Sequence, residues 1–407
     1  EILRCLVGSE MCIRDSDYII AGAGLSGSTF ARLRAEKGSK ILVIDRRSTV
    51  AGNLYDETNM YGILVQQYGP HIFHTNSEEV YSFITKYHKW NPFKLRCSVD
   101  MCGQQTPSPF NFKTIDQFYD TDKAELIKEA LLLKYPNQST VTIVELLNSE
   151  EPLIKEYAQM LFDNDYSLYT AKQWGIKASE IDINVLKRVP IRLDYKEMYF
   201  SDKYECMPEG GFTSFIKDLL DHDNIEYINN EDALKYISLN DQDHRIEFHG
   251  LEVSANCKLV YTGAIDELFN YEFGKLPYRS LTFKYETLNE ELFQATPVVA
   301  YPQVEGYTRI TEYKQLPKQN ILGITTIAYE YPMMFEEGKA DEPYYPVPTD
   351  DTAVLYSKYK AKAGNYDNLI LCGRLANYKY YNMDQAILAV LRLSLIHISE
   401  PTRHLRI

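Results

Sequence analysis

The chain of 407 residues carries 43 Lys and Arg against 57 Asp and Glu, a net charge of −14. Hydrophobic residues make up 45% and charged residues 25%, which is typical of a globular protein and excludes a disordered or collagen-like chain. A chain of this length predicts two or three domains. The acidic balance disfavours nucleic acid and anionic membranes as partners. No window reaches the ~18 unbroken apolar residues typical of a membrane span.

The two ends of the chain differ in character from the rest. Residues 1–16 and 394–407 resemble peptides that arise when sequencing-adapter DNA is translated, so we expect two non-native tails and a native start near Asp17. The first tail lacks the apolar core and cleavage site of a signal peptide. The seven cysteines are scattered without a CxxC pair, which favours reduced thiols in a cytoplasmic protein over a zinc site or a disulfide framework.

A strand–helix–strand unit follows the first tail. Residues 17–21 predict a buried strand, residues 28–37 a helix, and residues 41–44 a second strand that ends in Asp45. The glycine-rich sequence GAGLSG, residues 22–27, stands between the first strand and the helix. This order predicts a dinucleotide-binding unit in which phosphates face a helix N-terminus.

Each part of this fingerprint has a physical role. Gly22 permits a tight turn, Gly24 lets the backbone approach a pyrophosphate, and Gly27 allows the helix to pack closely on the strand. Asp45 follows the last glycine by 18 residues and can accept hydrogen bonds from an adenosine ribose. The fingerprint alone does not distinguish FAD from NAD.

The pattern changes twice in the middle of the chain. Residues 117–134 and 141–169 carry apolar residues at helical spacing, which predicts an inserted bundle of several helices. After Tyr199 the alternation predicts an antiparallel sheet, with strands at residues 225–228, 233–239, 245–248, 259–261, 281–285, 298–301 and 321–327. Residues 368–373 predict a late strand that rejoins the first domain.

These segments predict an α/β fold. Its parts are a discontinuous Rossmann-like dinucleotide-binding domain, an inserted helical bundle and an antiparallel β-sheet domain. The expected boundaries are 17–113 and 366–393 for the first domain, 114–190 for the bundle, and 191–365 for the sheet domain with its returns to the first domain.

Several sequence strings, in the same order, resemble bacterial UDP-galactopyranose mutases. They include GPHIFHT (69–75), YTAKQWG (169–175), KRVPIRL (187–193), YRSL (278–281), YTRITEYK (307–314) and GRLANYKYYNMDQ (373–385). The resemblance implies a homodimeric enzyme that binds FAD and interconverts UDP-galactopyranose and UDP-galactofuranose. It also implies that N5 of reduced FAD attacks the anomeric carbon and expels UDP, so no protein nucleophile is expected.

The resemblance assigns roles to residues of this chain. Arg188 and Arg309 are implied to hold the diphosphate, whose oxygens match guanidinium forks, and Arg279 and His71 are implied to lie near the reacting atoms. The other implied substrate contacts are Tyr169, Thr170, Trp174, Tyr199, Tyr345 and Tyr380. The implied flavin contacts are Gly22, Gly24, Ser26, Gly27, Asp45, Asn53, His71, Ile72, Arg374, Met383, Asp384, Gln385, Ala386, Ile387 and Leu388. No metal is expected, because His71 and His74 lack a carboxylate or Cys in register.

Some positions depart from the family pattern. Leu95 and Ala300 stand about where the family has substrate-contacting asparagines, which puts the choice of nucleotide sugar in question. Asn382 replaces an acid and Asp384 replaces a histidine. Two other functions stay open: a flavin oxidoreductase of the amine-oxidase type, which shares the cofactor domain, and a UDP-sugar-binding protein without catalytic activity.

Overall fold

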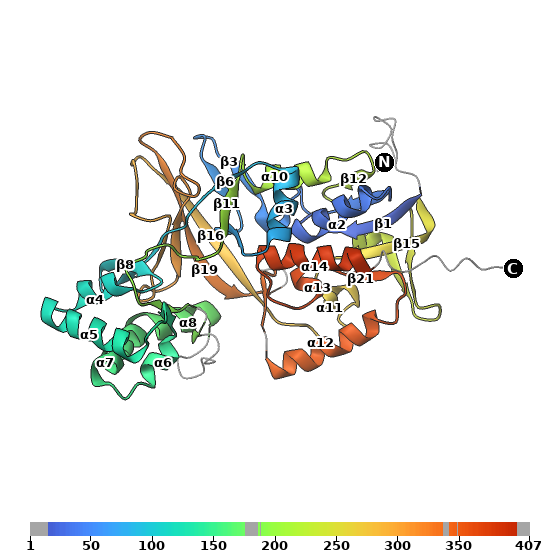
Figure 1. Cartoon of the computed structure of the whole chain (residues 1–407). Coiled ribbons are helices and arrows are strands. Elements are labelled where there is room, and N and C mark those ends of the chain that lie inside the picture. The colour runs from blue at the N-terminus through green and yellow to red at the C-terminus, as the bar shows by residue number, and fades with distance from the viewer. Residues whose placement is uncertain (1–14, 176–185, 188, 337–341, 348, 397–407) are drawn as a thin grey trace.

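The structure is a computed structural model that describes residues 15–175, 186–187, 189–336, 342–347 and 349–396, apart from the side chains of Trp174 and residues 394–396. A parallel-sheet domain and a helical part lie at opposite ends of the molecule, with a long seven-stranded sheet between them (Figure 1). No helix in the described ranges has the length and apolar character needed to cross a membrane.

The parallel sheet has five strands. Its order is β12 (Ile225–Ile228), β2 (Ile41–Ile44), β1 (Ser16–Ala21), β15 (Val253–Tyr261) and β21 (Leu369–Leu371). All four residues of β2 are buried, which is typical of a parallel strand covered by helices on both faces. The predicted strand at residues 41–44 is confirmed to the residue, and the late strand rejoins this sheet as expected.

Helices pack on both faces of this sheet. Ile20 belongs to one hydrophobic core and its neighbour Ile19 to another, because successive side chains of a strand point to opposite faces. The first core includes residues of α2 (Leu25–Ala35), α10 (Phe212–Leu220) and α14 (Met383–Ile396). The second includes residues of α11 (Ile265–Leu268) and α12 (Asp350–Ala363).

Two expectations are corrected in this domain. Residues 225–228 and 259–261, expected in the antiparallel sheet, pair as parallel strands with β2 and β1. Short apolar runs do not reveal by their pattern which sheet they join. In addition, β1 begins at Ser16, which is fully buried and pairs with Val253, so the folded chain includes the last residue of the expected tail.

The seven-stranded sheet is antiparallel except for one pair. Its order is β20 (Tyr345–Pro346), β16 (Tyr278–Leu288), β19 (Thr325–Met334), β18 (Arg309–Glu312), β17 (Val298–Ala300), β7 (Cys97–Met101) and β8 (Gln104–Ser108). Strands β17 and β7 run parallel. The expected antiparallel sheet is therefore confirmed, and it also recruits two strands from the N-terminal segment.

The helical part is an insertion closed by a small strand pair. Its helices are α4 (Phe112–Phe118), α5 (Thr121–Lys134), α6 (Ile143–Leu147), α7 (Pro152–Leu161), a π-helical turn (Phe162–Tyr166) and α8 (Ser167–Trp174). Capping boxes at Asn111 and Thr142 start α4 and α6. The pair β9 (Thr140–Val141) and β10 (Ile191–Arg192) joins the middle of the segment, between α5 and α6, to the chain that follows it. The predicted helical insertion is confirmed.

Smaller elements complete the fold. They are η2 (Gly52–Leu54), β3 (Asp56–Thr58), β4 (Leu64–Gln66), β5 (Phe73–Thr75), α3 (Glu78–Tyr87), β6 (Trp90–Pro92), β11 (Tyr204–Pro208), η5 (Ala233–Tyr236), β13 (Ile237–Asn240), β14 (Arg245–Phe248) and α13 (Gly373–Ala376). The strand expected at residues 233–239 is thus a 3₁₀ turn followed by β13, because the Asp232 side chain caps the turn by accepting a hydrogen bond from the Leu234 amide.

Candidate active site

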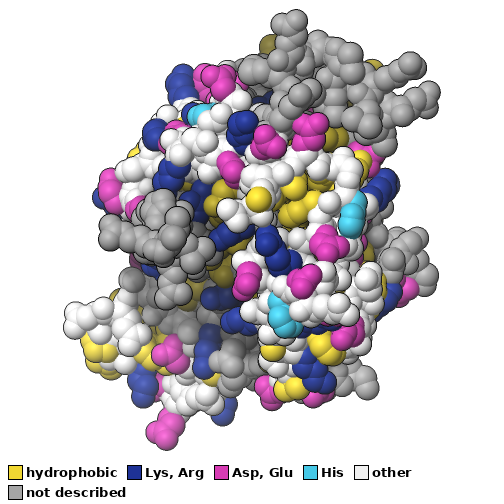
Figure 2. Space-filling view, turned by 90° about the vertical axis from the view of Figure 1, so that its right-hand side faces the viewer, with side chains coloured by type: hydrophobic (Ala, Val, Ile, Leu, Met, Phe, Trp, Pro, Cys, Tyr) yellow, Lys and Arg dark blue, Asp and Glu magenta, His cyan; other side chains and the backbone are white. Residues whose placement is uncertain are grey.

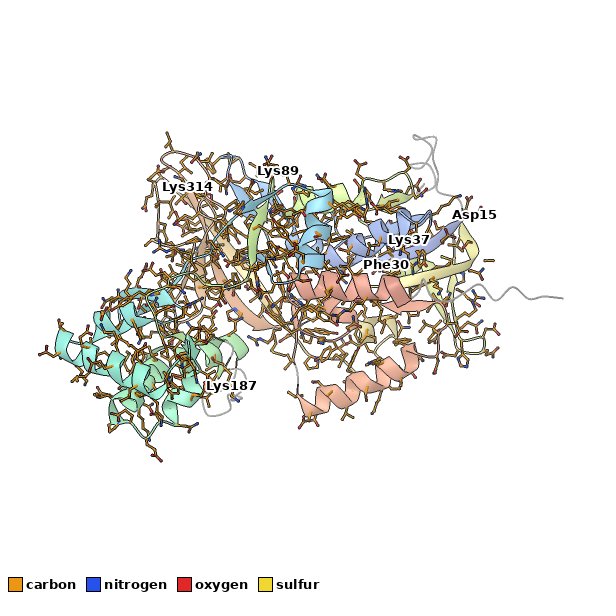
Figure 3. The ribbon with its side chains drawn as sticks, viewed as in Figure 1. Asp15, Phe30, Lys37, Lys89, Lys187 and Lys314 are labelled. Atoms are coloured by element: carbon orange, nitrogen blue, oxygen red, sulfur yellow. The ribbon has the colours of Figure 1, made fainter. Side chains whose placement is uncertain are left out.

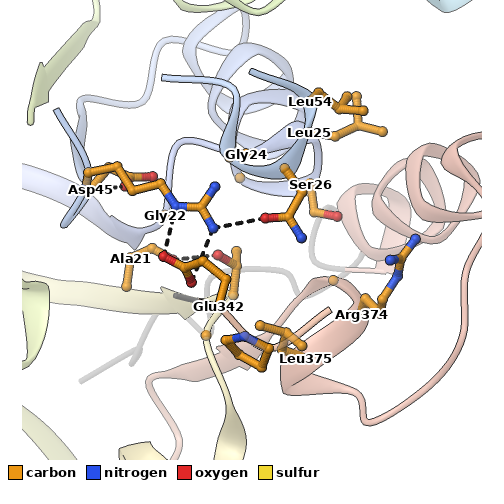
Figure 4. A pocket seen from close by; sticks show the side chains of 18 of the residues that line it. Ala21, Gly22, Gly24, Leu25, Ser26, Asp45, Leu54, Glu342, Arg374 and Leu375 are labelled. Atoms are coloured by element: carbon orange, nitrogen blue, oxygen red, sulfur yellow. Dashed lines mark hydrogen bonds and ion pairs between the residues drawn. The ribbon is translucent and has the colours of Figure 1, made fainter. Parts of the chain in front are cut away.

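A pocket runs along the first strand–helix–strand unit of the parallel-sheet domain. Ten of the predicted flavin contacts line it: Gly22, Gly24, Ser26, Gly27, Asp45, Asn53, His71, Arg374, Met383 and Ala386. Figure 4 shows Asp45 and Glu342 on one side of the pocket and Arg374 on the other. The pocket therefore joins the end of β2 to the loop of His71 and the start of α14, which are distant in the sequence.

The N-terminus of α2 is suited to a phosphate. Gly24 is its N-cap, no side chain caps the helix, and no acidic residue lies in its first turn, so the first amides are available to an anion. A Cβ at Gly27 would lie 2.0 Å from the Gly22 carbonyl oxygen, so the close packing predicted for this glycine is confirmed. A Cβ at Gly24 would find its nearest atom at 3.8 Å, so the space before Gly24 is open to a ligand.

Asp45 is held at the end of β2 by two backbone amides. Its Oδ2 accepts a hydrogen bond from the Ala23 amide at 2.7 Å, and its Oδ1 accepts one from the Arg47 amide at 2.9 Å. Each carboxylate oxygen has a further lone pair, so the buried carboxylate keeps the capacity to accept ribose hydroxyls.

An arginine that the sequence did not reveal organises the same end of the pocket. Arg47 donates from Nη2 to Asn53 Oδ1 at 2.8 Å and pairs with Glu342 Oε2 at 3.1 Å. Its buried Nη1 has no partner among the described residues. Asn53 is thus positioned by Arg47, and an acceptor from a bound ligand would satisfy the remaining guanidinium donor.

His71 lies at the other end of the pocket. Its Nδ1 is 2.8 Å from the Gly69 carbonyl oxygen, which can only accept, so Nδ1 carries the proton. Burial, and then the charges of Arg374 and Arg309, lower the pKa of His71 to about 4. The ring is therefore neutral at pH 7, and its Nε2 is an unprotonated acceptor.

One face of the seven-stranded sheet brings together three of the residues predicted for the substrate site. Directly opposed residues of neighbouring strands point to the same face. Arg309 of β18 is opposite Glu330 of β19 and Ala300 of β17. Arg279, which alternates onto the same face of β16, is opposite Tyr345 of β20. Five strands thus contribute to one surface between the parallel-sheet domain and the helical part.

Arg309, which is partly exposed, and the buried Glu330 form an ion pair on this face. Glu330 Oε2 accepts from Arg309 Nε at 2.8 Å and Nη2 at 2.7 Å. Burial by itself would lower the pKa of Arg309, but the charge of Glu330 outweighs it and raises the pKa well above its usual value. Nη1 stays free of this pair and can meet a ligand anion. Sequence reasoning missed Glu330 because the predicted strand ended at residue 327.

Aromatic side chains surround the pair. The rings of Tyr345 and Tyr380 stack with centroids 5.5 Å apart, and Arg374 lies 4.9 Å from the Tyr345 ring. Tyr169 of α8 is close enough to Arg309 for their charges to interact, although burial dominates and raises the pKa of Tyr169. These contacts place the predicted flavin contact Arg374 beside two predicted substrate contacts.

The remaining predicted substrate residues are only partly described. Thr170 is buried in α8, and the Tyr199 amide donates to the Leu95 carbonyl at 2.8 Å. Arg279 donates from Nη2 to the Gln173 carbonyl at 2.8 Å at the end of α8. Arg188 and the side chain of Trp174 lie outside the described residues.

Five predicted flavin contacts do not line the pocket. Ile72 and Ile387 belong to the hydrophobic core, and Leu388 packs against it. Asp384 accepts a hydrogen bond from Thr75 Oγ1, and Gln385 accepts one from the Asn382 amide. The helical periodicity of α14 turns the last four of these side chains away, while Met383 and Ala386 of the same helix reach the pocket.

The second histidine of the GPHIFHT string has a different environment. His74 Nδ1 lies 3.0 Å from Asp202, and its ring stacks on Phe200 with centroids 3.8 Å apart. Within the described ranges, no group of three or more His, Cys, Asp or Glu residues is arranged to hold a metal ion.

The fold and the site define a dinucleotide-binding α/β enzyme with an arginine-containing sheet face beside its cofactor pocket. The NAD(P)-binding Rossmann-like domain family matches residues 20–87, and the UDP-galactopyranose mutase family matches residues 165–380. The chain belongs to the UDP-galactopyranose mutase family, a family of isomerases.

Relatives match along most of their length. The chain is 34% identical to a dTDP-fucopyranose mutase of Escherichia coli, covering 93% of this chain and 98% of that protein. It is 35% identical to a UDP-galactopyranose mutase of Mycoplasma genitalium, covering 94% and 95%.

Solved structures agree in fold. A reduced UDP-galactopyranose mutase superposes with a TM-score of 0.69 at 15% identity, covering 96% of this chain and 95% of that one. A putrescine oxidase superposes with a TM-score of 0.53 at 12% identity, covering 95% and 99%.

Proposed function

We propose that the protein is a flavin-dependent isomerase that interconverts UDP-galactopyranose and UDP-galactofuranose. The Arg309–Glu330 pair carries the proposal, because it presents a fixed guanidinium on the cleft face beside the pocket end marked by His71 and Arg374. A protein of net charge −14 needs such local cations to hold a diphosphate.

The residues of the pocket fit FAD. The open space at Gly24, the uncapped N-terminus of α2 and the unpartnered Nη1 of Arg47 would receive the pyrophosphate and its neighbours, and Asp45 would receive the ribose. When bound and reduced, the flavin supplies the nucleophile for the anomeric carbon, while the protein binds and orients.

The side chains of the cleft neutralise and orient the leaving group. Arg309 would bind the diphosphate through the nitrogen that Glu330 leaves free, and Arg188 is proposed as its counterpart. Tyr345 and Tyr380 offer hydroxyl donors that add no charge, and Tyr169 and Trp174 are proposed to contact the nucleoside. His71, neutral at pH 7, presents only an acceptor from Nε2 to the reacting region.

An amine-oxidase-like function is less well supported. The likeness to putrescine oxidase concerns the fold alone, at 12% identity. An oxidoreductase of that type would need an apolar cage around the bond that is oxidised, whereas this sheet face carries an arginine paired with a glutamate, and stacked tyrosines. A sugar-binding protein without activity would not need the flavin pocket to meet the cleft.

A second nucleotide sugar is favoured by two apolar side chains. Ala300 lies on the cleft face directly opposite Arg309, and Leu95 is buried beside the Tyr199 backbone. Neither can hydrogen-bond a hydroxyl group through its side chain. A 6-deoxy sugar or a thymine methyl group would suit such positions, as in the substrate named for the Escherichia coli relative. The second candidate is therefore dTDP-fucopyranose.

One experiment distinguishes the functions. Chemically reduced holoenzyme is incubated separately with UDP-galactopyranose and dTDP-fucopyranose, and the products are separated by chromatography. A furanose product from either nucleotide sugar supports isomerisation, and the ratio of the two kcat/KM values identifies the preferred substrate. Net oxidation of the sugar, or bound nucleotide without any product, would support one of the rival functions instead.

We also propose a cytoplasmic homodimer. Leu126 and Leu133 of α5 are 54% and 84% exposed, and their spacing of seven residues places them on one face of the helix. A second copy would bury these two leucines. Analytical ultracentrifugation of a Leu133→Glu variant tests the dimer.

On the face shown in Figure 2, basic and acidic side chains are interspersed, which offers no broad basic surface to nucleic acid.

A further inference from the structure

Lys172 connects α8 to the loop that precedes Arg309. Its Nζ donates hydrogen bonds to the carbonyl oxygens of Tyr301, at 2.6 Å, Tyr307, at 3.0 Å, and Val304. All three carbonyls belong to the loop between β17 and β18. Among the described residues Lys172 has no ion-pair partner, so three backbone dipoles take the place of a carboxylate.

Three convergent carbonyl oxygens form a small cation site within the loop. The loop is closed by the Tyr301 amide, which donates to the Thr308 carbonyl at 2.8 Å. Its carbonyl dipoles point at one centre and would repel one another without a positive charge there. Burial lowers the pKa of Lys172, whereas the three carbonyl oxygens match the three donors of its charged ammonium group. The ammonium therefore fixes the loop conformation.

The loop leads directly to the diphosphate-binding pair. The Thr308 amide donates to the Glu330 carbonyl at 2.8 Å, and Thr308 is completely buried. Arg309 follows and is oriented by the Glu330 carboxylate. A change in the loop conformation would therefore be transmitted to the position of the Arg309 guanidinium.

At its other end the connection reaches the proposed nucleoside-binding residues. Lys172 lies in α8 between Thr170 and Trp174, two predicted substrate contacts. Arg279 also holds this helix end, since it donates to the Gln173 carbonyl at 2.8 Å. Two cationic side chains thus join the helix to the sheet. Lys172 of α8 donates to carbonyls of the loop between β17 and β18, and Arg279 of β16 donates to a carbonyl of α8.

We propose that Lys172 is a positioning residue that couples the nucleoside-binding helix α8 to Arg309, so that the nucleoside and diphosphate subsites keep their separation. This inference rests on the proposed function. It concerns binding of the nucleotide part, because neither Lys172 nor the three residues whose carbonyls it binds line the flavin pocket. Loss of Lys172 should therefore affect nucleotide affinity and leave flavin binding unchanged.

The test compares Lys172→Met and Lys172→Ala holoenzymes with the wild type. We expect KM for the nucleotide sugar, and Kd for UDP or dTDP, to rise roughly tenfold, with kcat changed less than about threefold and with full flavin content. Lys172→Arg, which keeps the charge and the donors, should recover most of the affinity. Adding ammonium or ethylammonium ions should restore binding to Lys172→Ala, because a free cation can enter the carbonyl site.

Lys314→Met is the matched control. Lys314 is also buried and donates to the carbonyl and carboxylate of Glu291, but it follows β18 at the end away from α8. Lys314 and Lys187, which is near α8 in sequence, lie far apart in Figure 3. The control should lose thermal stability without a change in KM.

Each outcome is decisive. An unchanged KM and Kd in Lys172→Met would overturn the proposal, as would equal KM effects in Lys314→Met. Failure of both amine rescue and the arginine variant would also overturn it, since a general packing defect would then explain the loss. If the wild type neither binds UDP or dTDP nor forms a product, the proposed function has failed rather than the role of Lys172.

Discussion

Arg309 and Glu330 face each other across β18 and β19, with Glu330 Oε2 within 2.8 Å of both Nε and Nη2 of Arg309. One carboxylate oxygen therefore fixes one edge of the guanidinium and leaves Nη1 free. Thr308, the residue before Arg309, donates its amide to the Glu330 backbone carbonyl. The geometry of the candidate anion site is thus determined by contacts within the sheet before any ligand binds.

Removing the carboxylate should destabilise the protein. Glu330→Gln leaves the Arg309 charge without its counter-ion. Because the Arg309 side chain is 27% exposed, we expect a loss of unfolding free energy smaller than the ~3–5 kcal/mol that breaking a fully buried pair costs. Urea unfolding of the apo-protein measures the loss. The double variant Glu330→Gln, Arg309→Met should lose less than the sum of the single variants. Additive losses would show that the two side chains do not stabilise each other.

Removing the guanidinium should affect activity more than flavin binding. Arg309→Lys keeps a positive charge but loses the fork that Glu330 orients, so we expect kcat/KM to fall at least tenfold, which is about 1.4 kcal/mol of transition-state stabilisation. The flavin spectrum should stay unchanged. Steady-state kinetics and absorbance on the same preparation provide both readouts. Wild-type kinetics in this variant would place the diphosphate elsewhere.

Gly24 and Gly27 should respond differently to alanine. A Cβ at Gly24 meets no protein atom closer than 3.8 Å, so Gly24→Ala should fold with less than ~1 kcal/mol change in stability yet lose FAD, because the methyl group occupies the phosphate approach. A Cβ at Gly27 would lie 2.0 Å from the Gly22 carbonyl, so Gly27→Ala should lower the melting temperature as well. Flavin content and calorimetry separate the two effects. A Gly24→Ala protein with its full content of bound flavin would contradict the assignment of this pocket to FAD.

His71 should make the protein sensitive to acid. Its folded-state pKa of about 4 lies below the ordinary value of 6.5, so the unfolded chain binds the extra proton more readily. The contribution of the neutral His71 ring to the free energy of unfolding is complete above pH 6.5 and is lost as the pH falls from 6.5 towards 4. His71→Asn, which cannot take up a proton, should show a shallower fall of melting temperature over this range. Parallel curves for the two proteins would refute the assignment.

The sequence predicted the cofactor-binding unit well because its signals are local. Gly22–Gly27 and Asp45 lie within one strand–helix–strand unit, and each residue constrains the backbone or a hydrogen bond at its own position. Strand β2 was predicted to the residue for the same reason.

Features that depend on distant pairing could not be predicted in this way. Arg47, Asn53 and Glu342 meet only after the chain returns to the first domain, and nothing local to Glu342 indicates this. The pairing of Glu330 with Arg309 depends on strand register, which the predicted strand ends did not specify. Ten of the flavin contacts that the resemblance implied line the pocket, but the orientation of single side chains along α14 required the structure.

The most direct test of the proposed function compares the amount of product formed with the amount of reductant consumed. The holoenzyme, either reduced with dithionite or oxidised in air, is given UDP-galactofuranose, and the moles of UDP-galactopyranose formed are compared with the moles of reductant consumed. Because the reaction rearranges the sugar without net oxidation, we expect activity only after reduction, with many turnovers for each reducing equivalent and no change in the mass of the nucleotide sugar. Full activity of the air-oxidised enzyme without any reductant, or one reducing equivalent consumed for each product, would contradict the account.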